Sequence, residues 1–403
     1  MESIFIQIAS YRDPELIPTI DDLLANADNP ESLTICIAHQ HSKEDAWDTL
    51  EKYALDGRFI IIDIPHLESQ GACWARNQIQ QHYNGETYTL QLDSHHRFVK
   101  GWDTLSINML KDLQSKGYKK PMLTGYIPSY NPKKDPEDRH QVPWGMLFDK
   151  FIDEGIVFFK PYHVNDLPAN PIKARFYSAH FAFTLGEFST EVQHDPLLYF
   201  HGEEITISVR AFTHGYDLFH PHKVIAWHEY TREGRTKHWN DDLSWSHKNI
   251  VSHTRTKTLL GVDGLVCTPC NAKSFEKYNV GTQRTISDYE LYAGIRFKDR
   301  AVTQACKNND PPPGNLTDRY LTKFNYSFTF NASSFTKQDY EFAALILQDN
   351  KGKEVYRKDY FYFTSILDSP TFKINENIVT PYKWIIWSYS KTNGWAERIE
   401  GLI

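Results

Sequence analysis

Residues 88–98, Tyr-Thr-Leu-Gln-Leu-Asp-Ser-His-His-Arg-Phe, form an apolar segment that runs directly into metal-ligating and phosphate-binding side chains. The apolar half predicts a strand, and Asp93 and His95, two residues apart, follow at its end and point the same way. A carboxylate for a hard divalent cation and a neighbouring Arg97 to balance negative charge suit a metal-bound diphosphate. The alternative is a strand that ends in a polar turn, so the rest of the chain has to decide.

Around this segment, apolar strands alternate with amphipathic helices. In the first 126 residues, the expected strands are 4–9, 33–39, 59–64, 88–92 and 122–126, and the expected helices are 13–27, 43–56, 69–83 and 101–116. This series predicts an α/β, Rossmann-like fold with a mostly parallel sheet and helices on both faces. Ligands of such sheets bind at the carboxyl ends of the strands, where both Asp93 and residues 10–13 fall.

Later segments continue this pattern and then change character. Residues 127–175 are rich in Pro, Asp and Lys and are expected to form a loop. After them come an expected strand at 176–184, a helix at 202–215 and a strand at 223–228. A Pro-rich linker begins at Cys306 and is followed by alternating Tyr/Phe-rich runs at 323–330, 340–348, 354–364 and 382–389. We therefore expect a catalytic domain over 1–305 and a small, antiparallel, β-sandwich-like domain over 306–403.

Composition limits the kinds of partner. The chain has 403 residues with 44 basic and 51 acidic side chains and a formal net charge of -7. This balance argues against a nucleic-acid surface or a polybasic membrane anchor, so a phosphate-bearing ligand has to be held by local Arg, Lys, His or metal. Aromatic residues make up 14% of the chain, which suits sugar stacking but also large mixed cores.

The N-terminal residues and the cysteines indicate a compartment. No basic start with a long apolar stretch is present, and no window approaches the 18 apolar residues that a spanning helix needs. Five scattered cysteines argue against a disulfide framework and for a reducing compartment, so we expect a cytoplasmic protein without a membrane anchor. Cys267 and Cys270 are the only close pair, and we interpret them as ordinary thiols.

The candidate nucleotide-binding residues lie after the first strand and in the third helix. Ser10, Tyr11 and Arg12 offer an aromatic face and a guanidinium for a base, a ribose or phosphates. The same stretch also suits a helix start, with Ser10 or Asp13 as the cap. Arg76 lies on the first turns of its helix, where it contacts a pyrophosphate or faces solvent.

A third metal ligand is required beside Asp93 and His95. This mixed carboxylate and imidazole set suits manganese better than magnesium or calcium. His228 is preferred because residues 223–228 are again an apolar strand that ends in His, whereas His238 and His220 fit less well.

Eight segments together resemble a known family, the cytosolic-type polypeptide N-acetylglucosaminyltransferases. The segments are 6–16 (Ile-Gln-Ile-Ala-Ser-Tyr-Arg-Asp-Pro-Glu-Leu), 71–76 (Gly-Ala-Cys-Trp-Ala-Arg), 90–98, 101–103 (Gly-Trp-Asp), 200–205 (Phe-His-Gly-Glu-Glu-Ile), 215–219 (Gly-Tyr-Asp-Leu-Phe), 228–230 (His-Glu-Tyr) and 281–285 (Gly-Thr-Gln-Arg-Thr). That family adds α-linked GlcNAc to hydroxyproline of a ubiquitin-ligase subunit and is related to mucin-type polypeptide GalNAc-transferases. The resemblance covers roughly residues 3–297.

The resemblance implies a GT-A fold, a UDP-sugar donor and Mn2+, or another divalent cation, bound through an Asp-x-His (DXH) motif. Its site residues map onto Asp93, Ser94 and His95 for the motif, His228 for the later ligand, Tyr11 and Arg12 for uridine, and Arg76 for the diphosphate. Glu203 or Glu204 would lie beside the donor sugar, although two acidic residues in a first helical turn also interact favourably with the helix dipole.

The expected function is therefore a metal-dependent, retaining glycosyltransferase that moves GlcNAc from a UDP-sugar to a hydroxyl group, on a protein. The expected catalytic residues are Glu203, Glu204 and Arg97. Transfer to a glycan or small molecule is an alternative within the class. A carbohydrate-binding protein with a degenerate site is an alternative outside it, while a metal-dependent hydrolase would require more carboxylates.

Overall fold

The computed structural model describes residues 2–165, 168–231, 233–265, 274–335, 340–361, 363, 367 and 370–403. Cys267 and Cys270 lie outside the described residues, as do residues 362 and 364 of one expected strand. The chain forms two compact units, Met1–Lys298 with Ala305–Asp318 and Asp299–Gln304 with Arg319–Ile403. The expected boundary at 305/306 stays a prediction.

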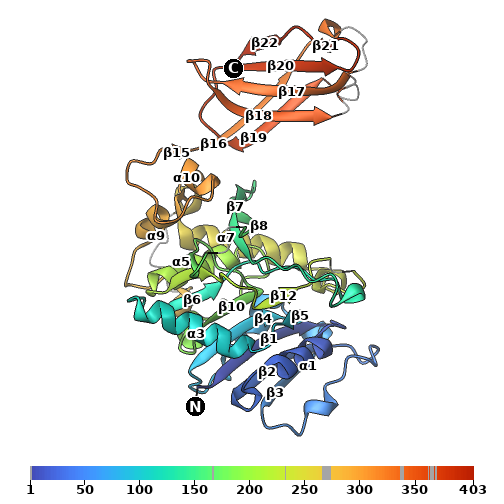
Figure 1. Cartoon of the computed structure of the whole chain (residues 1–403), viewed down its shortest axis with the longest axis vertical. Helices are drawn as coiled ribbons and strands as arrows, with labels where there is room; N and C mark the ends of the chain where they lie inside the picture. Colours follow the sequence, from blue (N-terminus) through green and yellow to red (C-terminus); the bar gives the residue numbers. More distant parts are fainter. Residues whose placement is uncertain are drawn as a thin grey trace. The chain divides into compact units, whose positions relative to one another are not determined.

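An eight-stranded sheet organises the first unit (Figure 1). Its strands, in the order in which they pair, are β3 (Phe59–Pro65), β2 (Leu33–His41), β1 (Ile4–Tyr11), β4 (Tyr88–Asp93), β10 (Phe181–Leu185), β6 (Pro121–Thr124), β11 (Asp217–His220) and β9 (Ile172–Lys173). The pairs β1–β2, β1–β4, β2–β3 and β6–β11 are parallel, and β10 runs antiparallel between β4 and β6. The four parallel strands β1 to β4 therefore end at one edge of the sheet.

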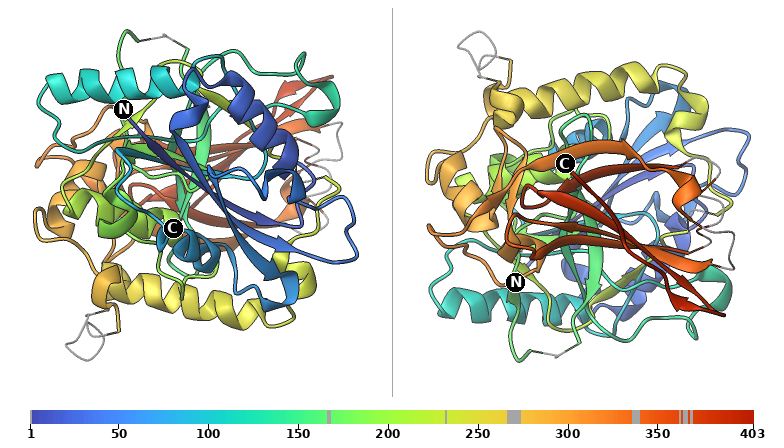
Figure 2. Two further views of the ribbon diagram at one scale, coloured as in Figure 1. Left: turned by 90° about the horizontal axis from the view of Figure 1, so that it is seen from below. Right: turned by 90° about the horizontal axis from the view of Figure 1, so that it is seen from above.

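Helices cover both faces of this sheet. Ile4, Ile6 and Ile8 of β1 pack in one core with α1 (Leu16–Asn26) and α3 (Trp102–Ser115). Phe5 of β1 packs instead with α2 (Ala72–Gln80), because successive side chains of a strand point to opposite faces. In the left view of Figure 2, α1 and α3 lie on one side of the blue strands and α2 lies on the other. The expected mostly parallel sheet with helices on both faces is confirmed.

The other elements of the first unit surround the sheet. They are β5 (His96–Phe98), β7 (Trp144–Phe151), β8 (Val157–His163), α4 (Phe188–Glu191), α5 (Glu203–Thr213), β12 (Ala226–His228), α6 (His238–Asp241), α7 (Trp245–Leu260), α9 (Ile286–Ala293) and β13 (Ile295–Arg296), followed by α10 (Gln304–Lys307), which begins at the boundary between the units. Short 3-10 turns span Pro30–Ser32, Glu51–Tyr53, His66–Glu68, Pro132–Lys134, Val262–Gly264 and Glu276–Tyr278. β12 pairs antiparallel with β5 and aligns His228 with His96.

Two expectations about local structure are wrong. The expected helix at 43–56 contains only the 3-10 turn Glu51–Tyr53, because Asp48 turns inward to meet His39 while Leu55 is fully exposed. The expected loop at 127–175 contains the antiparallel hairpin β7–β8, whose Met146 and Phe148 are buried. In both segments, tertiary contacts outweigh the local pattern.

The second unit is built from antiparallel strands. These are β14 (Ala301–Thr303), β15 (Tyr320–Leu321), β16 (Lys323–Thr329), β17 (Tyr340–Gln348), β18 (Glu354–Phe361), β19 (Thr371–Asn377), β20 (Lys383–Ser390), β21 (Gly394–Trp395) and β22 (Ile399–Leu402), with a 3-10 turn at Ala332–Ser334. One sheet pairs β16 with β19, and another has the central order β18-β17-β20. Phe328, Phe372, Leu345 and Ile386 from both sheets share one core, which confirms the expected antiparallel β structure.

Within the described ranges, no helix combines the length and the apolar character that crossing a membrane requires.

Candidate active site

Three potential metal ligands, two neighbours in the sequence and one distant from them, meet at the carboxyl edge of the main sheet. Asp93 is the last residue of β4, His95 follows it, and His228 is the last residue of β12. One potential ligand atom from each lies within 4.8 Å of the other two. The Nε2 atoms of His95 and His228 lie 3.7 and 3.5 Å from Asp93 Oδ2. The structure therefore brings together the three residues that the sequence predicts as metal ligands.

Asp13 orients His95. The carboxylate of Asp13 is buried and accepts hydrogen bonds from His95 Nδ1 at 2.8 Å and Ser94 Oγ at 2.7 Å. Burial raises the pKa of Asp13, but His95 and Arg235 outweigh burial and hold that pKa below its usual range. A hydrogen bond from one ring nitrogen to a carboxylate leaves the other nitrogen as a metal ligand, as in many metal sites. The sequence indicated Asp13 as a possible helix cap and as one of residues 10–13 at the carboxyl end of a strand, but it did not indicate the contact with His95.

His228 has the properties of a metal ligand. Its ring is buried, and neither ring nitrogen has a hydrogen-bond partner among the described residues. Burial lowers the pKa of His228 well below its usual value, so the imidazole is neutral. Its ring stacks on His180 at 4.3 Å between centroids, a neighbour that the sequence did not indicate. An unpartnered neutral imidazole beside a carboxylate fits a divalent cation, because an orphaned buried nitrogen is otherwise costly.

Arg76 connects the cluster to the first turn of α5. Its buried guanidinium lies 2.8 Å from Asp93 Oδ1 and 3.0 Å from Glu203 Oε1. Cys73 Sγ also donates to Glu203 Oε2 at 3.2 Å. Burial raises the pKa of Asp93, but His228, Arg76 and His95 outweigh burial and hold that pKa well below its usual range. Arg76 therefore fixes two carboxylates, while its contact with a diphosphate stays a prediction.

Glu204 has a different environment from Glu203. Its Oε1 accepts from the backbone N of Ala179 at 3.0 Å, and its Oε2 accepts from Tyr126 Oη at 3.3 Å. Burial and the neighbouring Glu203 raise the pKa of Glu204 to about 8. The Glu204 carboxyl is therefore mainly protonated near neutral pH and can donate a hydrogen bond.

Two cavities meet at this cluster. The first is lined by Tyr11, Ser94, His95, Arg235, Lys237, His238 and Trp239, among others. The second is lined by Tyr126, Trp144, Phe158, Glu203, Glu204, His228 and Tyr230, among others. Asp93, Arg76 and Phe200 line both cavities. A reaction between two substrates needs this arrangement, with the reactive groups at the junction of two binding spaces.

Tyr11 and Arg12 both contact Asp241 of α6, the helix whose His238 and Trp239 line the first cavity. Tyr11 Oη donates to Asp241 Oδ2 at 2.7 Å, and Arg12 Nη1 lies 3.0 Å from the same oxygen. Arg12 also pairs with Asp45 at 2.7 Å, and its backbone is left-handed at φ 46°. Tyr11 lines the cavity, whereas Arg12 and the buried Ser10 do not. Nucleotide contacts of Ser10, Tyr11, Arg12 and Ser94 stay predictions.

The structure does not bring Arg97 to the cluster. Arg97 lies on β5, where its Nη2 pairs with Glu15 at 2.7 Å and its Nη1 donates to Tyr130 Oη at 3.0 Å. It lines neither cavity. Alternation along β5 turns Arg97 away from the side of His96, whose ring lies near His228. Its expected catalytic role has no geometric support here.

Comparison with known proteins gives a family match and a fold match. A family model described as glycosyltransferase (GlcNAc) matches residues 3–58 and 48–299. No sequence among curated proteins matches the chain. The crystal structure of GalNAc-T7 with UDP, GalNAc and Mn2+ has a TM-score of 0.50 and 13% identity, and the match covers 96% of this chain and 69% of that chain. This likeness concerns the fold alone and agrees with the expected GT-A architecture.

Structures at lower TM-scores come from TarS of S. aureus. TarS 1-349 in complex with UDP-GlcNAc has a TM-score of 0.35 and 13% identity, and the match covers 63% of this chain and 72% of that chain.

Proposed function

The chain belongs to the glycosyltransferase (GlcNAc) family, and on this premise we propose that it is a metal-dependent, retaining enzyme that transfers GlcNAc from a UDP-sugar to a protein hydroxyl group. The observation that carries the proposal is the cluster of Asp93, His95 and His228 at the junction of two cavities. The nucleotide part of the donor then lies in the first cavity and the acceptor in the second, with the donor sugar at their junction beside Glu203 and Glu204.

The first cavity suits a nucleoside diphosphate. Tyr11 and Trp239 provide aromatic surfaces for a base, and Arg235 and Lys237 bring positive charge to the same cavity. GalNAc-T7, whose fold this chain shares, was crystallised with UDP, GalNAc and Mn2+. We therefore propose a UDP-sugar as the donor, with its diphosphate directed toward Asp93.

Asp93, His95 and His228 would hold Mn2+ or another divalent cation, which when bound supplies positive charge for a leaving diphosphate. The surrounding residues keep these ligands in place. Asp13 fixes the His95 ring and Arg76 fixes the Asp93 carboxylate, so little reorganisation accompanies ligand binding.

In the proposed reaction the acceptor oxygen attacks the anomeric carbon from the face that the phosphate oxygen leaves. The bond from the anomeric carbon to that phosphate oxygen breaks, and the acceptor proton passes to the departing diphosphate. No carboxylate nucleophile is required for this same-face transfer. Glu203 is already bound to Arg76 and Cys73, while the protonated Glu204 can donate to a sugar hydroxyl. We assign the two acids to positioning the donor sugar.

The second cavity suits a substrate with apolar rings. Trp144, Phe158 and Tyr230 line it beside Glu204. The resemblance of the sequence to hydroxyproline-specific polypeptide N-acetylglucosaminyltransferases supports a protein acceptor with a hydroxyproline oxygen as the nucleophile. The same resemblance and the scattered cysteines support a cytoplasmic location.

A donor panel tests this proposal. We would assay hydrolysis of UDP-GlcNAc, UDP-GalNAc, UDP-Gal and UDP-Glc with and without Mn2+, and then transfer to proline and hydroxyproline peptides. We expect Mn2+-dependent turnover that is fastest with UDP-GlcNAc, and transfer only to the hydroxylated peptide with retained α configuration. If no donor binds or reacts, the chain is a carbohydrate-binding relative without transferase activity.

A further inference from the structure

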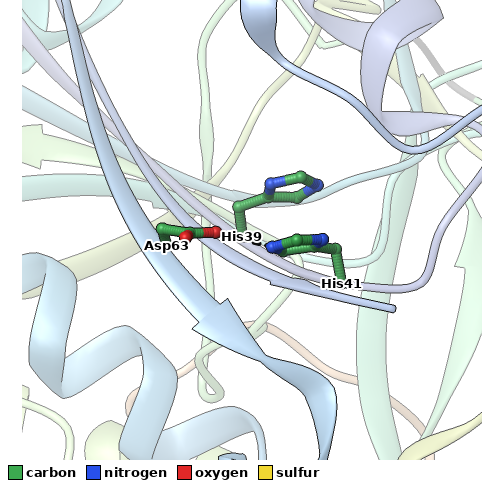
Figure 3. A group of neighbouring side chains, drawn as sticks. All are labelled: His39, His41 and Asp63. Atoms are coloured by element: carbon green, nitrogen blue, oxygen red, sulfur yellow. Dashed lines mark hydrogen bonds and ion pairs between the residues drawn. The ribbon is translucent and has the colours of Figure 1, made fainter. Parts of the chain in front are cut away.

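A second cluster of potential ligands lies on the edge strands of the main sheet. His39 and His41 belong to β2, Asp63 belongs to β3, and the strand register places His39 directly opposite Asp63. One ligand atom from each lies within 4.8 Å of the others. Figure 3 shows the two imidazoles side by side with the Asp63 carboxylate next to them. None of the three residues lines either cavity of the candidate active site.

A fourth residue, Asp48, forms a hydrogen bond with the His39 ring. His39 Nε2 donates to Asp48 Oδ1 at 2.8 Å, and the Asp48 side chain is 1% exposed. The other carboxylate oxygen, Oδ2, is buried without a hydrogen-bond partner among the described residues. This is the carboxylate–histidine pair that orients ring nitrogens at many metal sites. With Nε2 donating to Asp48, the His39 Nδ1 lone pair is free for a ligand.

The cluster also lacks a permanent positive charge. Within the described ranges, neither Asp48 nor Asp63 forms an ion pair with Lys or Arg, since each is paired only with an imidazole. A buried carboxylate without a counter-charge is costly. The Asp48 and Asp63 carboxylates together carry two negative charges, which one divalent cation would balance.

We propose that His39, His41 and Asp63 bind a second divalent transition-metal ion, and that Asp48 positions His39 for it. Two imidazoles and a carboxylate form a ligand set that suits Zn2+. The two rings now stack at 4.5 Å with an interplanar angle of 13°, so both cannot direct a lone pair to one ion without movement. His41 is the more exposed of the two rings, and its Nε2 lies 2.6 Å from Asp63 Oδ1. In the proposed site this contact breaks as the His41 ring rotates to bind the ion.

The consequence of this site is structural. It joins β2 to β3 at the edge of the sheet and, through Asp48, holds the segment that follows β2. Asp45 in that segment pairs with Arg12, which in turn pairs with Asp241 of α6, the helix whose His238 and Trp239 line the first cavity. Occupation of the site therefore stabilises the carboxyl edge of the sheet without providing a ligand to the reaction.

The test compares Zn2+ binding in two variants that both carry Asp93→Ala, which removes the carboxylate from the cluster of Asp93, His95 and His228. Asp93→Ala is the background, and Asp93→Ala/His41→Gln/Asp63→Asn removes the two less buried members of the second cluster. We expect equilibrium dialysis with elemental analysis to find one fewer Zn2+ per chain in the triple variant. Zn2+ should also raise the Tm of Asp93→Ala but not that of the triple variant. Residual binding at other histidines or cysteines is the same in both proteins.

A matched control replaces the exposed His82, which belongs to no ligand cluster among the described residues, in the Asp93→Ala background. His82→Gln should leave the zinc content and the Tm shift unchanged. Equal zinc content and equal Tm shifts in the background and the triple variant would overturn the proposal. The metal-free Tm of each variant shows that the comparison is made between folded proteins. Because the background has no active-site cluster, the outcome does not depend on the proposed transferase activity.

Discussion

The active-site cluster and the edge cluster are made from the same kinds of side chain but differ in their surroundings. Asp93, His95 and His228 lie between two cavities, whereas His39, His41 and Asp63 lie beside neither of them. The Asp63 side chain is 74% exposed, and the Asp93 side chain is 25% exposed. A ligand set alone therefore does not distinguish a catalytic metal site from a structural one.

Fixed charge provides a second difference between the clusters. Arg76 contacts Asp93 and Glu203, and Arg235 contacts Asp13, so permanent cations surround the active-site cluster. The edge cluster has imidazoles as its only cationic candidates in the described part of the chain. Fixed positive charge suits a site where a diphosphate departs, because it stabilises developing negative charge without reorganisation. Variants matched across the two clusters test this distinction.

The largest expected effect follows from loss of Asp93. Asp93→Ala should lower kcat/KM for UDP-sugar turnover by about 10²–10³-fold or more, because the proposed diphosphate stabilisation is lost. Steady-state hydrolysis assays with saturating Mn2+ measure this loss. The matched variant Asp63→Asn removes a carboxylate from the edge cluster and should keep wild-type kcat/KM. Equal activity of Asp93→Ala and wild type would contradict the assignment of the active-site metal.

A smaller effect is expected when the supporting carboxylate is changed and the ligands remain. Asp13→Asn should raise the Mn2+ concentration for half-maximal activity by about 10–100-fold, because His95 loses its orienting partner. Titration of activity with Mn2+ measures the change. Asp48→Asn, the corresponding variant of the edge cluster, should leave this Mn2+ dependence unaltered and weaken Zn2+ binding. An unchanged Mn2+ titration in Asp13→Asn would show that His95 does not need Asp13.

Glu204 should give the active-site region a pH dependence that the edge cluster lacks. Its pKa is raised from 4.5 to about 8, first by burial and then by Glu203. Turnover should fall as the pH rises through about 8, because the ionised carboxyl no longer donates a hydrogen bond. A kcat/KM profile from pH 6 to 9.5 should show this fall in the wild type and not in Glu204→Gln.

The free energy of unfolding should change with pH in the same direction as turnover. A raised carboxyl pKa means that the folded state holds the proton more tightly, so the stabilising contribution is complete below 4.5 and is lost as the pH rises through about 8. The free energy of unfolding of the wild type should therefore decline over this range relative to Glu204→Gln. Parallel pH profiles for the two proteins would show that Glu204 is not protonated in the folded state.

The smallest expected effect concerns the contact of Tyr11 with α6, the helix whose His238 and Trp239 line the first cavity. Tyr11→Phe removes the hydrogen bond to Asp241, which is worth about 1 kcal/mol, so KM for the donor should rise about fivefold with little change in kcat. Initial-rate assays across donor concentrations separate the two constants. Tyr53→Phe is a matched control, because Tyr53 Oη donates to Asp21 at the same distance of 2.7 Å and lies outside both cavities. An equal change in both variants would show an effect on stability alone.

Regular elements of the chain were predictable because their patterns are local. The strands at 4–9, 33–39, 59–64 and 88–92 were predicted within two residues of their observed ends, since continuous apolar runs indicate buried parallel strands. The helix at 43–56 was predicted incorrectly. Its local periodicity could not reveal that Asp48 is drawn to His39 on the preceding strand.

The candidate site was predictable only in part. Asp93, His95 and His228 were identified because each lies at or just after the end of an apolar strand. The parallel strands of the main sheet end at one edge with Asp93, whereas β12, which ends at His228, pairs with β5 outside that sheet. The contact of Asp13 with His95 and the stacking of His180 on His228 were missed, because these residues come together only in the folded chain. Arg97 was assigned to catalysis from its proximity in sequence to His95, but strand alternation turns it toward Glu15.

The sequence by itself determined the alternation of strands and helices, the antiparallel C-terminal strands and membership of a glycosyltransferase family, because these depend on patterns within short segments. Only the tertiary structure decided which charged groups face one another. It paired Arg76 with Asp93 and Glu203, and it placed His95 and His228, the proposed metal ligands, beside Asp93. The Arg76–Glu203 and Asp93–His228 contacts join residues more than a hundred positions apart. The energies of such contacts depend on distance and burial, which a linear pattern does not contain.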